Sequence, residues 1–156
     1  MRERLHGFTL IELVVTISII AILAAVALPR YIALQTQART AKMQAIYGGV
    51  RSAAMLAHAQ AIATNSTAAL TISMEGAIID QVNGYPTSTR SGIIRALQLD
   101  ATNDQVTISP DAAAAGSTIT IDINGATSVA NCNVSYTSAL VNASPIIVLP
   151  LVPDCS

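Results

Sequence analysis

An apolar stretch close to the start of the chain constrains its folding more than any other feature. Residues Phe8 to Leu28 read FTLIELVVTISIIAILAAVAL, which is 21 residues with a single charge, Glu12. A helix rises about 1.5 Å per residue, so the stretch is long enough to cross a hydrocarbon core of roughly 30 Å. Thirteen of the 21 residues are Phe, Ile, Leu or Val, and together they outweigh a carboxylate that costs at most about 3 kcal/mol. We therefore expect this stretch to insert into a membrane as a helix.

The charges around the stretch predict its orientation. Residues 1–7 read MRERLHG and place Arg2 and Arg4 before the apolar run, whereas the sequence directly after it carries few charges. Positive residues beside a membrane helix favour the cytoplasmic side. Residues 1–7 are therefore expected in the cytoplasm.

Two interpretations of this segment compete. It could be an ordinary secretory signal, because residues 25–27 read AVA and offer a cleavage site after Ala27. Alternatively it is a retained anchor. Two features favour retention: Glu12, at the fifth position after Gly7, has no purpose in a disposable signal, and the run exceeds the usual apolar region of about 7–15 residues.

The residues at the start of the run carry a family resemblance. GFTLIEL at residues 7–13 is similar to the prepilin cleavage motif of type IV pilins and type II secretion pseudopilins. The resemblance implies that a prepilin peptidase cuts between Gly7 and Phe8 and methylates the new amine of Phe8. Glu12 then becomes the fifth mature residue, where the family has a Glu, and Pro29 becomes the 22nd, where it often has a Pro.

An ionisable residue inside a membrane is costly and marks a function by default. For Glu12 the implied partner is the Phe8 amine of a neighbouring subunit, and such a pair sets register more than strength, because desolvation offsets much of the attraction. The alternative is that Glu12 reaches the headgroups. Pro29 lacks an N–H and is expected to kink the helix or to loosen it locally on assembly.

The next part of the chain reads as an amphipathic, Ala-rich helix that continues from the anchor to about residue 65. Together the two parts make one helix of roughly 80 Å. Gly48-Gly49 marks a weak point or a close-packing site. The side carrying Arg39, Lys42 and Arg51 is expected to face solvent. The apolar side is expected to contain Leu34, Ala38, Ala41, Ala45, Gly49, Ala53, Leu56 and Ala57.

After residue 65 the signals change to those of strands and turns. Alternation predicts strands, and Asn124-Gly125 predicts a hairpin turn between two of them. A short helix is expected at 91–99, with an N-cap among residues 87–91. The expected strands lie at 69–73, 105–109, 117–123, 126–138 and 145–150.

The expected fold class is α+β: a long N-terminal helix on an antiparallel sheet, which resembles the pilin fold. The expected divisions are a cytoplasmic leader, a transmembrane half and an amphipathic half of the helix, and a globular head, at residues 1–7, 8–29, 30–65 and 66–156. Within the family, mannose-sensitive haemagglutinin pilins resemble this chain most, through ALPRYIALQTQART after the anchor, GYPT at 84–87 and CNVSY at 132–136.

Two cysteines lie near the C-terminus. Cys132 and Cys155 belong to no CxxC or Cys/His cluster, so metal binding is not expected, and a distant pair in an exported protein reads as a disulfide. It would close a loop of about 24 residues, worth roughly 3 kcal/mol. In pilins such a loop is an exposed, variable face, so residues 139–154 are expected to meet adhesion targets or neighbours.

The chain shows no sign of enzyme chemistry. It has two histidines, His6 and His58, and it lacks a catalytic triad context, GxGxxG and a Walker loop. No cofactor and no metal are expected. Asp100, Asp104 and Asp111 offer a calcium alternative, although their spacing matches no known loop. With a net charge of −1, the chain attracts no nucleic acid in bulk.

The predicted function is that of a structural subunit of a type IV pilus, used for adhesion, motility or DNA uptake. Its expected partners are copies of itself, the inner membrane, prepilin peptidase, the pilus assembly platform and a host or surface receptor, with nucleic acid only if the pilus takes up DNA. It is expected in the inner membrane before assembly and in the extracellular pilus afterwards. The alternatives are a pseudopilin of a type II secretion system and a secreted soluble binding protein cleaved after Ala27.

Overall fold

The computed structural model describes residues 8–150 and 154–156. The chain divides into two compact units, one up to Gln35 and one from Thr36 onward, and each is treated by itself. A single helix, α1 (Leu10–Ala63), contributes to both units.

The described part of the first unit consists of Phe8, Thr9 and the first 26 residues of α1. Almost every side chain in it is exposed, and Pro29 lies inside the helix. The segment is therefore helical, but its described side chains form no hydrophobic core of their own.

In the second unit, the remainder of α1 supplies one side of the core. Met43, Ile46 and Val50 are buried at helical spacing, and small residues continue the same face to Ala61. The face predicted from the sequence was largely wrong: Ala53 and Ala57 are buried and Gly49 is half-buried, but Leu34, Ala38, Ala41, Ala45 and Leu56 are exposed. Of the side chains predicted to face solvent, Arg51 is exposed, whereas Arg39 and Lys42 are half-buried. Alanine occurs on nearly every side of this helix, so its spacing does not identify the buried side, whereas the three larger apolar residues do.

The end of α1 is defined by its backbone geometry. Asn65 adopts a left-handed conformation (φ 53°), the Ser66 N–H donates to the Ala61 carbonyl, and the Asn65 N–H donates to the Ile62 carbonyl. This is the Schellman arrangement that satisfies the last carbonyls of a helix. The helix therefore stops close to the predicted residue.

A three-stranded antiparallel sheet follows the helix, in the order β1-β2-β3. Its strands are β1 (Thr71–Met74), β2 (Ala77–Val82) and β3 (Tyr85–Pro86). The sequence predicts a strand at residues 69–73, close to β1, but no strand at β2 or β3. Strand β2 pairs with strands on both sides, which a local pattern does not reveal.

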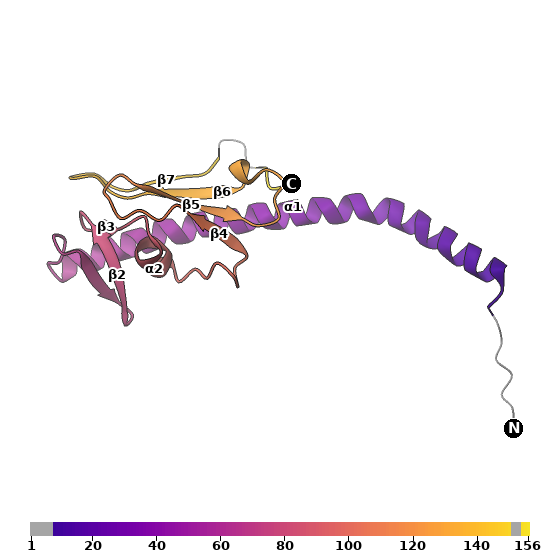
Figure 1. The fold of residues 1–156 in the computed structure, drawn as a ribbon, viewed down its shortest axis with the longest axis horizontal. Coiled ribbons are helices and arrows are strands. Elements are labelled where there is room, and N and C mark those ends of the chain that lie inside the picture. Colours follow the sequence, from indigo (N-terminus) through magenta and orange to yellow (C-terminus); the bar gives the residue numbers. More distant parts are fainter. Residues whose placement is uncertain (1–7, 151–153) are drawn as a thin grey trace, which may run out of the picture. The chain divides into compact units, whose positions relative to one another are not determined.

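A second antiparallel sheet has the order β4-β5-β6-β7, and Figure 1 shows these strands beside α1 in the second unit. Their bounds are β4 (Val106–Ser109), β5 (Thr118–Ile123), β6 (Asn133–Thr137) and β7 (Ile146–Val148). Buried residues alternate along β4, β5 and β6, as the sequence predicts. The two-residue hairpin at Asn124-Gly125 was wrong, because residues 124–132, including the 3₁₀ helix η2 (Val129–Asn131), connect β5 to β6.

Along the chain, two short helical segments connect β3 to β4: η1 (Arg90–Ile94) and α2 (Arg95–Leu97). The Thr89 hydroxyl accepts the Gly92 N–H at 2.8 Å and caps the start of η1. A Cβ at Gly92 would lie 2.3 Å from the Thr87 carbonyl oxygen, so only glycine fits there. The predicted helix ends early, because Gln98 takes a left-handed conformation.

The core lies between α1 and the two sheets. One cluster joins the Met43–Ala54 part of α1 to the four-stranded sheet, and a smaller one joins Ala57 and Ala61 to Ile72 and Ile79 of the three-stranded sheet. The architecture is α+β, as predicted, with two small sheets in place of one.

Candidate functional site

The predicted cleavage site lies at the edge of the described chain. Gly7 is outside the described residues, and Phe8 and Thr9 precede α1 without helical structure. The Phe8 side chain is 74% exposed. The residue predicted to become the mature N-terminus is therefore outside the helix.

A reciprocal cap fixes the start of α1. The Thr9 N–H donates to Glu12 Oε2 at 2.9 Å, the Thr9 hydroxyl donates to the same oxygen at 2.7 Å, and the Glu12 N–H donates to Thr9 Oγ1 at 3.3 Å. This is a capping box, in which two otherwise unpaired backbone N–H groups find side-chain acceptors. The sequence analysis missed Thr9, although T-x-x-E before an apolar run is the sequence signature of this cap.

The apolar side chains that follow have no cover within one chain. Leu10, Ile11, Ile20, Ile22 and Val26 are all more than 60% exposed. By length and composition, α1 is apolar enough to cross a membrane, a test that signal sequences also pass. Large exposed apolar surfaces mark sites of contact with a membrane or another protein.

The polar side chains in this stretch bond to their own helix. The Thr16 hydroxyl donates to the Leu13 carbonyl at 2.8 Å, and the Ser18 hydroxyl donates to the Val14 carbonyl at 2.7 Å. A hydrocarbon environment offers no water to such groups, so internal bonds are required there. The segment can therefore enter an apolar environment without leaving these hydroxyls unpaired.

Comparison with known proteins adds to this geometry. The sequence family described as "Prokaryotic N-terminal methylation motif" matches residues 4–28. The chain is also 50% identical over 58 residues to "Type IV narrow pilus major component PilA5" of Thermus thermophilus, a match that covers 37% of this chain and 50% of that protein. Both matches support a resemblance to type IV pilins over part of the chain. The chain spans about half the length of the curated relative it matches, and no solved structure matches it.

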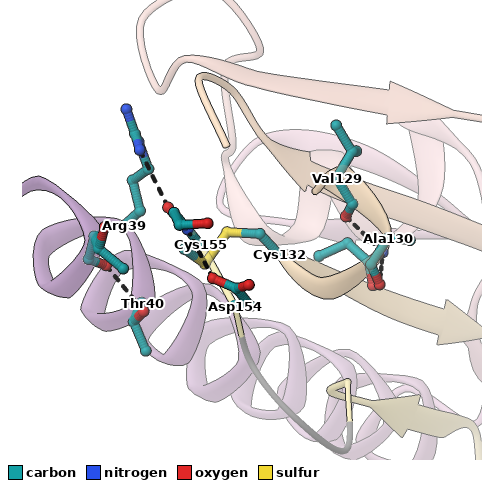
Figure 2. The surroundings of a disulfide bond; sticks show 10 residues. Arg39, Thr40, Val129, Ala130, Cys132, Asp154 and Cys155 are labelled. Atoms are coloured by element: carbon teal, nitrogen blue, oxygen red, sulfur yellow. Dashed lines mark hydrogen bonds between the residues drawn. A yellow bond between two sulfur atoms is a disulfide. The ribbon is translucent and has the colours of Figure 1, made fainter. Parts of the chain in front are cut away.

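The predicted disulfide joins Cys132 to Cys155 near the C-terminus (Figure 2). Cys132 and Cys155 are fully buried and bonded, with Cα atoms 5.0 Å apart. The Arg39 guanidinium on α1 donates to the Cys155 carbonyl at 3.1 Å, and the Asp154 N–H donates to the Asn131 carbonyl at 3.1 Å. The disulfide, the β5–β6 connection and α1 together hold the C-terminus.

The loop predicted to meet partners follows β6. Residues 140–144 are exposed, and β7 is an edge strand of the sheet. The last part of the predicted contact loop, residues 151–153, lies outside the described residues.

The aspartates considered for calcium serve separate local roles. Asp104 accepts the Asp100 N–H at 2.9 Å, and Asp100 accepts the N–H groups of Thr102 and Asn103. Asp111 pairs with Arg90 at 3.3 Å. Within residues 8–150 and 154–156, no three His, Cys, Asp or Glu side chains form a metal-binding group.

Proposed function

We propose that this chain is the structural subunit of a type IV pilus, which polymerises through the N-terminal part of α1. The observation that carries the proposal is the exposed apolar start of α1, which is headed by a cleavage motif and contains one carboxylate, Glu12. The pilus component that the chain matches supports a pilus role over a secreted binding protein cleaved after Ala27.

Processing would change the chemistry at this end of the helix. Cleavage between Gly7 and Phe8 by a prepilin peptidase creates a methylated, charged amine at Phe8. That amine is the natural partner of a carboxylate in an apolar environment, where an unpaired buried charge costs several kcal/mol. The Glu12 of an incoming subunit is proposed to pair with the Phe8 amine of its neighbour and so to set the stagger between helices.

The remaining apolar side chains would have two successive environments. Before assembly, the inner membrane covers them. In the filament, the same residues on neighbouring helices cover each other, because burial of apolar surface is the main favourable term in association. Pro29 lies inside α1 and lacks a backbone donor, so it is proposed as the point where the helix loosens on assembly.

The head would form the outside of the filament, with an assembly platform adding subunits from the membrane. A surface pilus of this kind is proposed to serve adhesion, motility or DNA uptake through partners of the head. No enzyme activity is proposed. A pseudopilin of a type II secretion system would share the N-terminal chemistry. The two roles differ in location, because a pilus extends from the cell surface and a pseudopilin filament stays in the envelope.

The test is filament assembly by Glu12 variants in cells that express the full chain. Glu12→Gln keeps the size of the side chain and an oxygen acceptor for Thr9 but removes the charge, and Glu12→Ala removes both. Glu75→Gln is the matched control, because Glu75 is an exposed carboxylate in the turn between β1 and β2.

We expect wild type and Glu75→Gln to yield long filaments in the fraction sheared from the cell surface, seen by electron microscopy. Both Glu12 variants should stay in the membrane at normal abundance with filaments reduced at least tenfold. Wild-type levels of filaments from Glu12→Gln would refute the charge pairing. Wild-type protein confined to the envelope would favour the pseudopilin, and protein free in the medium would favour the secreted alternative.

A further inference from the structure

Three of the chain's four tyrosines gather around the short strand β3 in the head. Tyr85 lies in β3 itself, Tyr47 faces it from α1, and Tyr136 lies beneath in β6. Two open hollows, of about 370 Å³ and about 520 Å³, are both lined by Tyr85 and Ser144. The two hollows adjoin at these two residues, between α1 and the segment that leads into β7, and we term them together the Tyr85 cleft.

The aromatic floor of the Tyr85 cleft is held in place. The rings of Tyr85 and His58 stack with centroids 4.0 Å apart and planes 7° from parallel. His58 Nδ1 lies 2.9 Å from the Gly84 carbonyl oxygen, which fixes the histidine ring. The buried Tyr136 hydroxyl donates to the Pro86 carbonyl at 2.7 Å and holds β3 from below. A fixed, half-exposed aromatic face is thus available to a ligand.

A cation without an internal partner lies in the same cleft. Arg51 on α1 is exposed, and across residues 8–150 and 154–156 its guanidinium forms no hydrogen bond or ion pair. The other arginines of the second unit are occupied: Arg39 by the Cys155 carbonyl, Arg90 by Asp111 and Arg95 by the Ile78 carbonyl. A guanidinium of this kind matches a carboxylate through two parallel hydrogen bonds.

The rest of the cleft combines an apolar wall with a polar rim. Met55, Pro145 and Ile147 line the side near Tyr47, and Asn83, Asn142 and Ser144 supply amide and hydroxyl groups. The backbone of the α1 wall is engaged in helical hydrogen bonds, so recognition on that side falls to side chains. A saturated ring with an apolar C–H face, hydroxyl groups around its edge and one carboxylate fits the aromatic face, the polar rim and the guanidinium of the cleft.

We propose that the Tyr85 cleft binds an acidic saccharide, a chain of sugars of the hexuronic acid class. The carboxylate of one sugar pairs with Arg51, its ring face packs on Tyr85 and Tyr47, and the hydroxyls of the next sugar meet the amide and hydroxyl rim. The site lies within the second unit alone, so it does not depend on filament assembly.

The probe is trigalacturonic acid, titrated calorimetrically into the full chain in detergent micelles. Its fully methyl-esterified form is the matched ligand control, because it keeps the sugar rings and loses the charges. Arg51→Gln is the test variant. Arg95→Gln is the control variant, since it makes the same charge change on α2, outside the cleft.

We expect trigalacturonic acid to bind wild type and Arg95→Gln equally, and both Arg51→Gln and the ester to weaken binding tenfold or more. Saturation of the tyrosine ring protons should transfer to the sugar ring protons in wild type, and Tyr85→Leu should reduce the transfer to what Tyr47 supplies while the far-ultraviolet circular dichroism spectrum stays unchanged. Absence of binding, equal binding by Arg51→Gln, or full competition by a triglutamate peptide would overturn the proposal.

Discussion

Thr9 and Glu12 form a reciprocal cap at the start of α1, in which the Thr9 N–H and the Thr9 hydroxyl both donate to Glu12 Oε2, at 2.9 and 2.7 Å. The carboxylate expected to pair between subunits is therefore already engaged within its own chain. In the precursor this bond gives Glu12 a partner before any neighbour is present. It also starts the helix after Phe8, so that the residue expected to follow the cleavage point stays outside it.

Replacing Thr9 by Val should loosen this helix start. The change keeps the shape of the side chain but removes the hydroxyl, and loss of an N-cap costs about 1 kcal/mol. The amide hydrogens of Glu12 and Leu13, which donate to the Thr9 hydroxyl and carbonyl, should then exchange roughly fivefold faster in the detergent-solubilised precursor, measured by NMR. Thr9→Ser should exchange like wild type. Equal exchange in Thr9→Val would show that the hydroxyl contributes nothing.

The neighbouring glycines of α1 should respond differently to alanine. A Cβ at Gly48 meets nothing within 4 Å, whereas a Cβ at Gly49 lies 2.7 Å from Leu97 Cδ1. Gly48→Ala should raise the free energy of unfolding of the head by about 0.5–1 kcal/mol through helix propensity. Gly49→Ala should have a free energy of unfolding at least about 1 kcal/mol below that of Gly48→Ala, because Leu97 must shift. Urea unfolding of both variants measures the difference, and equal stabilities would contradict the close packing.

Loss of the disulfide should destabilise the head. The double variant Cys132→Ser, Cys155→Ser should lose roughly 3 kcal/mol in free energy of unfolding, because the unfolded chain regains the freedom of the loop. Urea unfolding followed by near-ultraviolet circular dichroism of the tyrosines measures this loss. A reducing agent should lower the stability of wild type and leave the double variant unchanged. A change under reduction in the double variant would show that the agent acts elsewhere.

Tyr136 should make the head sensitive to alkali. Burial, and secondarily the nearby Tyr85, raise the pKa of Tyr136 above its ordinary value of about 10. As pH rises past about 10, the unfolded chain loses a proton that the folded head retains, so the free energy of unfolding should fall.

Tyr136→Phe tests this prediction. At pH 7 the variant should lose about 1 kcal/mol, because the Pro86 carbonyl loses its donor. Between pH 9 and 11 its stability should decline less than that of wild type in urea unfolding. An equal alkaline decline would place the effect on other groups.

The sequence predicts the features that depend on short-range patterns of residues. The apolar run at 8–28, the alternation of buried residues in β5 and the pairing of Cys132 with Cys155 are all present in the structure. The T-x-x-E cap is equally readable from the sequence, although neither of the two roles expected of Glu12, pairing between subunits or reaching the headgroups, included it.

Other features depend on contacts between distant segments. Strand β2 and the two-residue strand β3 form only because they pair with each other and with β1. The Tyr85 cleft joins α1, β3 and the segment before β7, which are far apart in the sequence. The buried face of α1 was misplaced because alanine packs wherever a neighbour approaches, and its position carries little directional information.

The central claim is tested most directly by the mature N-terminus, measured by mass spectrometry on protein sheared from the cell surface as filaments. We predict a methylated Phe8 as the first residue of the mature chain, with residues 1–7 removed. A chain that starts at Leu28 and is recovered free in the periplasm or medium would contradict it.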